Sequence, residues 1–135
     1  MNRLGLTRVA YACAAAADIP VRQRPFIEGE GADRHVRLTS RRIPRRVLAG
    51  GYLFWIIRHT LVARQQLLGV AEEATPDGQL AILRLHPHVE AIVPMHCRAH
   101  QGWRYIAEAD WPQIAPAGDA MPANLAAELA TLALL

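Results

Sequence analysis

The amino-acid sequence predicts an α+β fold built on a mostly antiparallel sheet. The chain has 135 residues, which is enough for one hydrophobic core. Several short runs of alternating or continuous apolar residues are typical of strands, and alanine-rich and leucine-rich segments have the composition of helices. Neither an internal repeat nor a linker divides the chain. We therefore expect residues 1–135 to form a single domain.

The first part of the chain predicts a strand, a short helix and a loop. Leu4 and Leu6 alternate with polar or small residues, as in a strand with one buried face. Residues 12–17 are almost all alanine and favour a short helix, which Pro20 is expected to stop. Residues 21–33 carry proline and glycine among charged residues, which indicates a connecting loop.

A second short helix, rich in arginine, is expected to begin at Pro44, where a missing N–H costs nothing. Gly50 and Gly51 suit the left-handed conformation that ends such a helix. The strongest strand signal follows directly at residues 52–57 (YLFWII), which are aromatic, β-branched and almost continuously apolar. This composition predicts a strand that is buried on both faces.

The remaining sequence predicts a meander of strands and a final helix. Residues 60–70 also fit a helix, but we expect a strand there, and residues 75–78 (TPDG) predict a turn. Short strands are expected at residues 80–85, 89–93 and 103–106, the second of them ended by Pro94. Leucines at helical spacing in residues 122–135 predict an amphipathic helix that docks on the sheet.

The composition excludes several kinds of chemistry. All 15 basic residues are arginine, so a Schiff-base lysine, a phosphate-loop lysine and a lysine base are ruled out. Ser40 is the only serine and lacks the flanking glycines of a hydrolase nucleophile. Cys13 and Cys97 do not make a disulfide scaffold, which favours a reducing compartment.

The same sequence indicates a cytoplasmic protein with no membrane partner. No apolar run approaches the roughly 18 residues that a membrane-spanning helix needs. The alanine-rich run near the N-terminus follows a charged residue, Arg8, and ends at Asp18, so it makes a poor signal peptide.

Three blocks of sequence resemble a known bacterial family, the domain of unknown function 1489 (DUF1489) family. Residues 50–58 (GGYLFWIIR) resemble the family segment GGSLYWVIK, residues 64–68 (RQQLL) resemble RQRIL, and residues 101–106 (QGWRYI) resemble QGWRYL. The blocks occur in the same order as in the family, and the resemblance extends from about His35 onward. It implies membership of the family but no activity, because none is firmly attached to the family.

Two departures from the family pattern affect acidic and basic positions. Residues 86–88 read HPH where the family has DPE, and residues 58–59 read RH where the family has KG. The order of a short helix, a glycine turn, an aromatic strand and a meander is similar to small PUA-like barrels that bind RNA. We therefore expect a barrel-like sheet, although a shared fold does not confer a shared function.

Basic residues are concentrated in the middle of the chain. No aspartate or glutamate occurs between Arg34 and Glu72, whereas after Arg104 the chain has acidic residues and no arginine. A local excess of guanidinium groups can hold phosphates through charge and through bidentate hydrogen bonds. The alternative is that these arginines only form a solvated surface. The charge pattern leads us to expect a non-enzymatic module that binds RNA or another phosphate-bearing ligand.

Aromatic residues near these arginines could add stacking surfaces. Tyr52, Trp55, Trp103 and Tyr105 could each hold a base, an interaction worth about 1–3 kcal/mol per base, although buried tryptophan is more often core. Gln101 and Arg104 could line a pocket with Arg58, or the block around Trp103 could simply anchor the sheet. The predicted ligand-binding residues are Arg41, Arg42, Arg45, Arg46, Trp55, Arg58, Arg64, Gln101, Trp103 and Arg104.

Two other functions remain open at this point. A small hydrolase could use histidine or a metal ion, because imidazole and thiolate side chains gather at His86, His88, His96, Cys97 and His100. Their spacing matches no established zinc pattern, so we predict no metal site, no cofactor and no assigned catalytic residue. A protein-interaction module, with an exposed apolar helix that meets a partner, is the third hypothesis.

Overall fold

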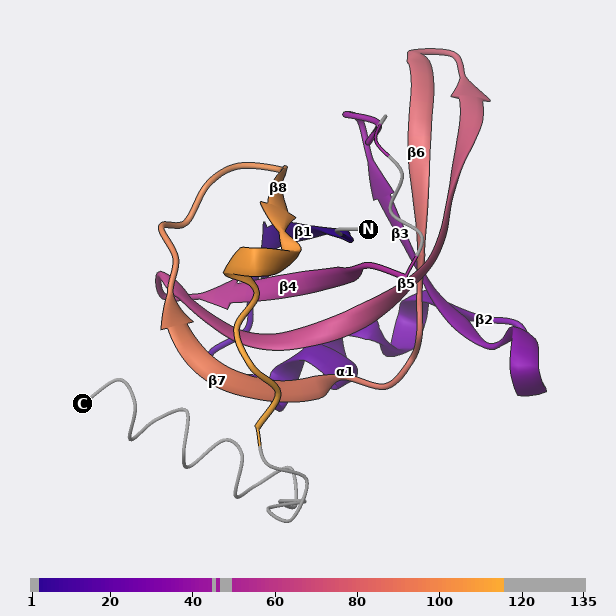
Figure 1. The fold of residues 1–135 in the computed structure, drawn as a ribbon. Helices are drawn as coiled ribbons and strands as arrows, with labels where there is room; N and C mark the ends of the chain where they lie inside the picture. The colour runs from indigo at the N-terminus through magenta and orange to yellow at the C-terminus, as the bar shows by residue number, and fades with distance from the viewer. Residues whose placement is uncertain (1–2, 45, 47–49, 116–135) are drawn as a thin grey trace.

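The chain folds into one mixed sheet with a short helix against it, which confirms the α+β prediction. The computed structural model describes residues 3–44, 46 and 50–115 (Figure 1). The strands are β1 (Leu4–Val9), β2 (Ile27–Glu28), β3 (His35–Ser40), β4 (Tyr52–Ile57), β5 (Thr60–Thr75), β6 (Gly78–Leu85), β7 (Glu90–His96) and β8 (Trp103–Ala107). The helix is α1 (Asp18–Gln23), and 3₁₀ turns occur at Arg24–Phe26, Gly31–Asp33 and Glu108–Asp110.

The strand order is β2-β3-β6-β5-β4-β1-β8, and β7 pairs with β5 beside this path. β1 and β4 run parallel, whereas every other pair among the described strands is antiparallel. The path ends at β2 on one side and at β8 on the other. The sheet formed by the described residues is therefore open, and the expected closed barrel is not confirmed.

β4 lies at the centre of the sheet and is buried on both faces, as its sequence predicts. Leu53 and Trp55 face one apolar cluster, which includes Leu6 from β1 and Ile19 from α1. Phe54 and its neighbours on the other face pack in a second cluster. Successive side chains of a strand point to opposite faces, so the continuous apolar run of β4 supplies both clusters.

β5 joins the two halves of the sheet, and Figure 1 shows it running from β4 into the hairpin with β6. Its first part pairs with β4 and β7, and its last part pairs with β6. The register shifts between Leu67 and Gly69, where a bulge bends the strand. As a result β3, which pairs with β6, reaches the face of the sheet that carries Leu6 and Trp55, and Val36 of β3 joins the same cluster.

The predicted positions of the first helix and of one loop are wrong. The helix begins at Asp18 rather than spanning residues 12–17. The Asp18 carboxylate accepts hydrogen bonds from the N–H groups of Ala14 and Ala15, which holds the alanine run in turns. Pro20 does not stop the helix, because a proline in the first turn forfeits no intrahelical hydrogen bond.

Several other boundaries also differ from the sequence-based expectation. Residues 21–33 include the end of α1 and all of β2, and β3 was not predicted. β7 continues through Pro94, because Pro94 lies where the pairing of β7 with β5 is interrupted, and a missing N–H there breaks no ladder hydrogen bond. β5 continues to Thr75, beyond the predicted end at Val70.

The two remaining predicted helices fall wholly or partly outside the described residues. Pro44 and Arg46 belong to no helix, and the rest of the arginine-rich helix, residues 45 and 47–49, is not described. The predicted C-terminal helix at residues 122–135 also lies outside the described residues.

Candidate functional site

The segment that follows β3 lies against the edge strand β8 through paired arginine and aromatic side chains. The guanidinium carbon of Arg42 lies 4.2 Å from the centroid of the Trp103 ring, and the Trp103 Nε1–H donates to the Arg42 carbonyl oxygen at 2.9 Å. The Arg46 guanidinium lies 5.4 Å from the Tyr105 ring, and the Arg46 backbone N–H donates to the Tyr105 hydroxyl at 3.1 Å. Trp103 and Tyr105 share one face of β8, so they hold both arginines on the same side of the sheet.

A cleft of about 650 Å³ opens beside this segment. Its walls are the end of β3, the β5–β6 turn and Gly102 before β8, and both Arg8 and Arg41 line it. Arg8 is the cross-strand neighbour of Trp103 and donates to the Thr39 carbonyl oxygen at 3.4 Å. We call this space, together with Arg8, Arg41, Arg42 and Arg46, the arginine cleft.

Arg8 is the unusual member of the arginine cleft because its side chain is partly buried, whereas the other three arginines are exposed. Leu4, Leu6 and Arg8 alternate along β1, so Arg8 points to the face that otherwise carries the core. Burial lowers the pKa of the Arg8 guanidinium from its ordinary value. A half-buried cation is destabilised unless a carboxylate or another anion offsets the lost hydration.

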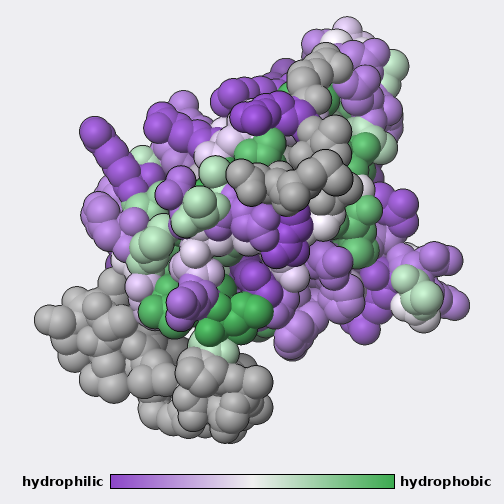
Figure 2. Space-filling view, in the orientation of Figure 1, coloured by the Kyte–Doolittle hydropathy of each residue, from purple (hydrophilic) through white to green (hydrophobic). Residues whose placement is uncertain are grey.

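The four guanidinium groups of the arginine cleft form no ion pair with any carboxylate of residues 3–44, 46 and 50–115. The arginine–carboxylate ion pairs of the described chain are elsewhere: Arg3 with Glu108 at 2.8 Å, Arg37 with Glu73 at 3.1 Å and Arg64 with Glu90 at 3.4 Å. Among the residues that line the cleft, Asp77 is the one acidic residue, beside Arg8 and Arg41. Figure 2 shows hydrophilic residues over much of the face that Figure 1 presents. The cleft therefore has a net positive charge.

The other predicted ligand-binding residues are not brought together in the arginine cleft. Arg58 is exposed in the β4–β5 turn, at the opposite end of β4 from Gly51. Arg64 is buried on β5, where its guanidinium lies 3.8 Å from the Tyr52 ring. Arg104 is exposed on the other face of β8, and Gln101 is exposed next to Gly102. Arg45 lies outside the described residues.

Neither predicted tryptophan is exposed to solvent. Trp103 is 2% exposed and Trp55 is 6% exposed, and both belong to the core. The Trp55 Nε1–H donates to Gln65 Oε1 at 2.7 Å. The most exposed aromatic side chains of the described residues are instead Tyr11 and Phe26, at 63% and 53%. Both tryptophan rings therefore pack in the core.

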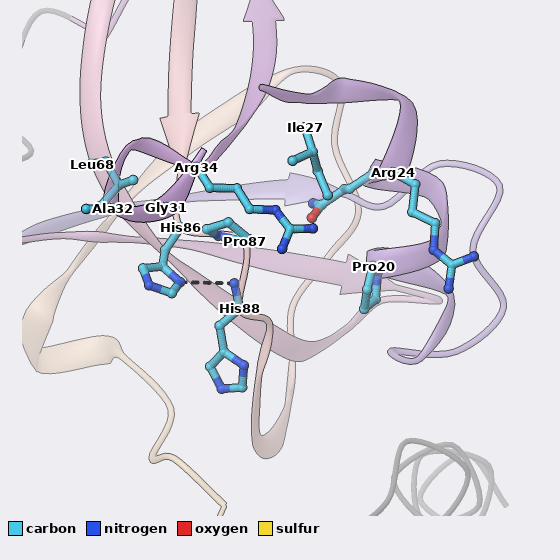
Figure 3. A pocket seen from close by; sticks show the side chains of 11 residues that line it. Pro20, Arg24, Ile27, Gly31, Ala32, Arg34, Leu68, His86, Pro87 and His88 are labelled. Carbon is cyan, nitrogen blue, oxygen red and sulfur yellow. Dashed lines mark hydrogen bonds between the residues drawn. The ribbon is translucent and has the colours of Figure 1, made fainter. Parts of the chain in front are cut away.

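The histidines lie on separate parts of the fold. His86 and His88 line a cavity of about 580 Å³ together with Arg24 and Arg34, and Figure 3 shows the Arg34 guanidinium pointing into it. The His88 backbone N–H donates to His86 Nδ1 at 3.0 Å, so the proton of a neutral His86 ring is on Nε2. His100, by contrast, forms a 2.8 Å hydrogen bond between its Nε2 and the Thr7 hydroxyl.

The described residues contain no group of three or more histidine, cysteine, aspartate or glutamate side chains that could hold a metal ion. Burial also raises the pKa of the Cys13 and Cys97 thiols, which disfavours the thiolate that metals bind. The described residues therefore hold no set of side chains that could bind the metal ion of a hydrolase.

Sequence reasoning missed Arg8, Tyr11 and Phe26 as candidate site residues. For Arg8 a signal was present, because a charged residue at the third inward position of an alternating strand is unusual. For Tyr11 and Phe26 no comparable signal exists, because exposure depends on how the loop after β1 and the turn after α1 pack.

One of three comparisons with known proteins finds a match to this chain. A family model described as "Protein of unknown function (DUF1489)" matches residues 6–135. Neither the curated proteins nor the solved structures contain a significant match to this chain. Within the described residues, no helix is both long and apolar enough to cross a membrane.

Proposed function

The chain belongs to the DUF1489 family, and we propose that it is a non-enzymatic module that binds RNA or another phosphate-bearing ligand in the arginine cleft. One observation carries this proposal. Arg8 and Arg41 line one cleft, Arg42 and Arg46 lie on the segment beside it, and none of the four pairs with a carboxylate of the described residues. Unpaired guanidinium groups in a concave site favour an anion with several oxygen acceptors.

The positions of the arginines support a fixed binding site rather than a diffuse surface. Arg42 and Arg46 are held by the Trp103 and Tyr105 rings, so less side-chain entropy is lost when they contact a ligand. A phosphate near Arg8 would also replace hydration that this guanidinium loses in the fold. Phosphate carries the charge and the acceptor geometry that both effects require.

The competing hypotheses have less support in the described residues. A histidine-dependent hydrolase would need a base held beside a second catalytic group, whereas the nearest polar partner of the His86 ring is the His88 backbone. A protein-interaction module was expected to use an exposed apolar helix, and the predicted leucine-rich helix at residues 122–135 lies outside the described residues. The likeness to PUA-like barrels adds only an analogy of fold.

The experiment measures binding of a fluorescent single-stranded RNA of mixed sequence, about 12 nucleotides long, which is within the range of such sites. Affinity should fall as salt rises from about 50 mM to about 200 mM, with a log–log slope of about 0.7 per phosphate contacted. The double variant Arg41→Ala, Arg46→Ala should bind more weakly and lower that slope. Arg42 is left intact because it packs on Trp103.

The matched control is the double variant Arg84→Ala, Arg98→Ala, which removes the same charge from two exposed positions outside the arginine cleft. It should bind RNA almost as the unmodified protein does. If both double variants lose the same amount of RNA affinity, net charge alone explains the effect and the arginine cleft is not the binding site. Absence of RNA binding at about 50 mM salt would end the proposal for RNA.

A further inference from the structure

A second cavity adjoins the arginine cleft and shares Arg8 with it. This cavity has a volume of about 210 Å³ and lies between β1, α1 and β3. Its lining is mostly apolar, with Trp55 and Ile19 among it, and it includes the exposed rings of Tyr11 and Phe26. We call it the aromatic pocket.

The size and the walls of the aromatic pocket restrict its occupant. Sites for drug-sized ligands have volumes of about 300–1,000 Å³, so a pocket of about 210 Å³ suits a single small ring system. Aromatic side chains bind flat rings by stacking, with little dependence on the identity of the ring. A flat, uncharged ring therefore fits this pocket better than a flexible chain does.

A buried amide network determines the hydrogen-bonding groups at the pocket. Trp55 Nε1–H can only donate, so the Gln65 atom it contacts at 2.7 Å must be the amide oxygen. That oxygen also accepts from Gln23 Nε2, at 2.6 Å. The Gln65 nitrogen donates to Gln23 Oε1 at 2.8 Å and to the His86 carbonyl oxygen at 3.0 Å. The side-chain amide of Gln65 therefore has no unused hydrogen-bond donor or acceptor.

Gln23 retains one N–H and one oxygen lone pair, because each of its amide atoms makes one hydrogen bond within the described residues. Gln23 is buried and lines the aromatic pocket. The pair with Gln65 uses the donor and the acceptor on one edge of the Gln23 amide, so the remaining N–H and lone pair point in different directions and each can meet a single polar group of a ligand. Because two hydrogen bonds with Gln65 hold the Gln23 amide, the directions of its remaining N–H and oxygen lone pair are fixed.

We propose that the aromatic pocket binds the base of a nucleotide unit whose phosphate lies in the arginine cleft, with Arg8 between the two. This inference rests on the proposed function and names the class of ligand. Arg22 also lines this pocket and adds positive charge beside the base. The nucleotide can be a free mononucleotide or one unit of an RNA strand, and the test separates these sources.

The first arm compares adenosine 5′-monophosphate with ribose 5-phosphate by titration calorimetry. The base should raise affinity by about 5- to 150-fold, the factor that stacking of one base supplies. The double variant Tyr11→Ala, Phe26→Ala should remove this difference and leave binding of ribose 5-phosphate unchanged. Both residues are exposed, so their loss leaves the core intact. Val21→Ala, an exposed apolar truncation on α1 outside the pocket, is the matched control.

The second arm compares an RNA oligonucleotide with an abasic oligonucleotide of the same length. A preference for bases that appears only in this arm, and that the Tyr11→Ala, Phe26→Ala variant abolishes, identifies a strand as the source. A preference in the first arm identifies a mononucleotide. If phosphate-bearing ligands bind but bases add nothing in either arm, the inference is overturned and the proposed function survives. If none of the four ligands binds, both fail.

Discussion

Arg42 and Trp103 hold each other through three interactions, with each residue donating a hydrogen bond to the other. The guanidinium of Arg42 covers the Trp103 ring at 4.2 Å, while the indole N–H of Trp103 donates to the Arg42 carbonyl oxygen at 2.9 Å. The Arg42 Nη1–H also donates to the Trp103 carbonyl oxygen, at 3.4 Å. Residues distant in the sequence are thereby fixed to each other, and the segment after β3 is fastened to β8. The predictions below begin with this pair.

Trp103→Phe should loosen the segment after β3 and leave a small cavity in the core, because Trp103 is almost fully buried. The N–H that donates to Arg42 is also lost, and the free energy of unfolding should fall by about 1–3 kcal/mol. RNA affinity should fall as well, because Arg42 would no longer be fixed at the cleft. Trp111→Phe removes a comparable hydrogen bond to Ile106 away from the cleft. Denaturant unfolding and RNA titration should show a stability loss in both variants and an affinity loss only in Trp103→Phe.

Gln65→Leu should be among the most destabilising single changes on β5. Gln65 is fully buried and satisfies Trp55 Nε1, the Gln23 amide and the His86 carbonyl oxygen. Each buried polar group that loses its partner costs about 1–3 kcal/mol, so the expected loss of unfolding free energy is about 3 kcal/mol or more. Gln66→Leu, at the exposed neighbouring position, is the control and should change stability little. A loss below about 1 kcal/mol for Gln65→Leu would contradict the network.

Gly5→Ala should separate β1 from β4. A Cβ atom at this position would lie 2.7 Å from the Tyr52 carbonyl oxygen, which belongs to the backbone and cannot rotate away. Strands so close must move apart, at an expected cost of about 1–3 kcal/mol. Gly69→Ala is the matched change, because a Cβ there meets no heavy atom within 4 Å. Thermal unfolding should show a clearly lower midpoint for Gly5→Ala than for Gly69→Ala.

The pH dependence of stability should include a contribution from Glu108. The hydrogen bond from the Arg3 side chain, followed by the bond from the Arg3 backbone N–H, lowers the pKa of Glu108 below its usual range. A carboxyl group whose pKa is lowered in the folded state stabilises the fold at pH values above its unfolded pKa. This stabilisation is lost as pH falls through the folded pKa. Glu108→Gln should thus reduce stability at neutral pH, and its stability curve should meet that of the unmodified protein in acid. Unfolding of both proteins is measured from pH 7 downward, and a difference in stability that stays constant over this range would contradict the contribution of Glu108.

Strong local signals predicted most strands, and tertiary packing decided the rest. The apolar run of β4 and the turn at residues 75–78 are visible in the sequence because each is encoded by adjacent residues. The position of α1 was wrong because a side-chain contact, from Asp18 to the alanine run, outweighed helix propensity. β3 was missed because its pairing with β6 involves residues far away in the sequence.

The candidate site was predicted in part for the same reason. The arginine run pointed to Arg41, Arg42 and Arg46, since local charge excess is visible without a fold. The tryptophans were expected to stack on bases, yet residue type alone does not separate a buried ring from an exposed one. Arg8 lines the cleft because β1 lies beside β8 and because the end of β3 is close enough for the Thr39 carbonyl oxygen to accept from Arg8.

The position of β1 between β4 and β8 has a consequence for synthesis on the ribosome. Leu6 of β1 pairs with Leu53 on one side and with Tyr105 on the other. β1 is synthesised first, so it can form its pairs only after β4 and β8 have been synthesised. Such high contact order slows folding and exposes an unpaired edge in the meantime. Arg8 acquires its place only when the last of these strands has left the exit tunnel, so a truncated translation product that ends before β8 would carry the arginines but not the cleft.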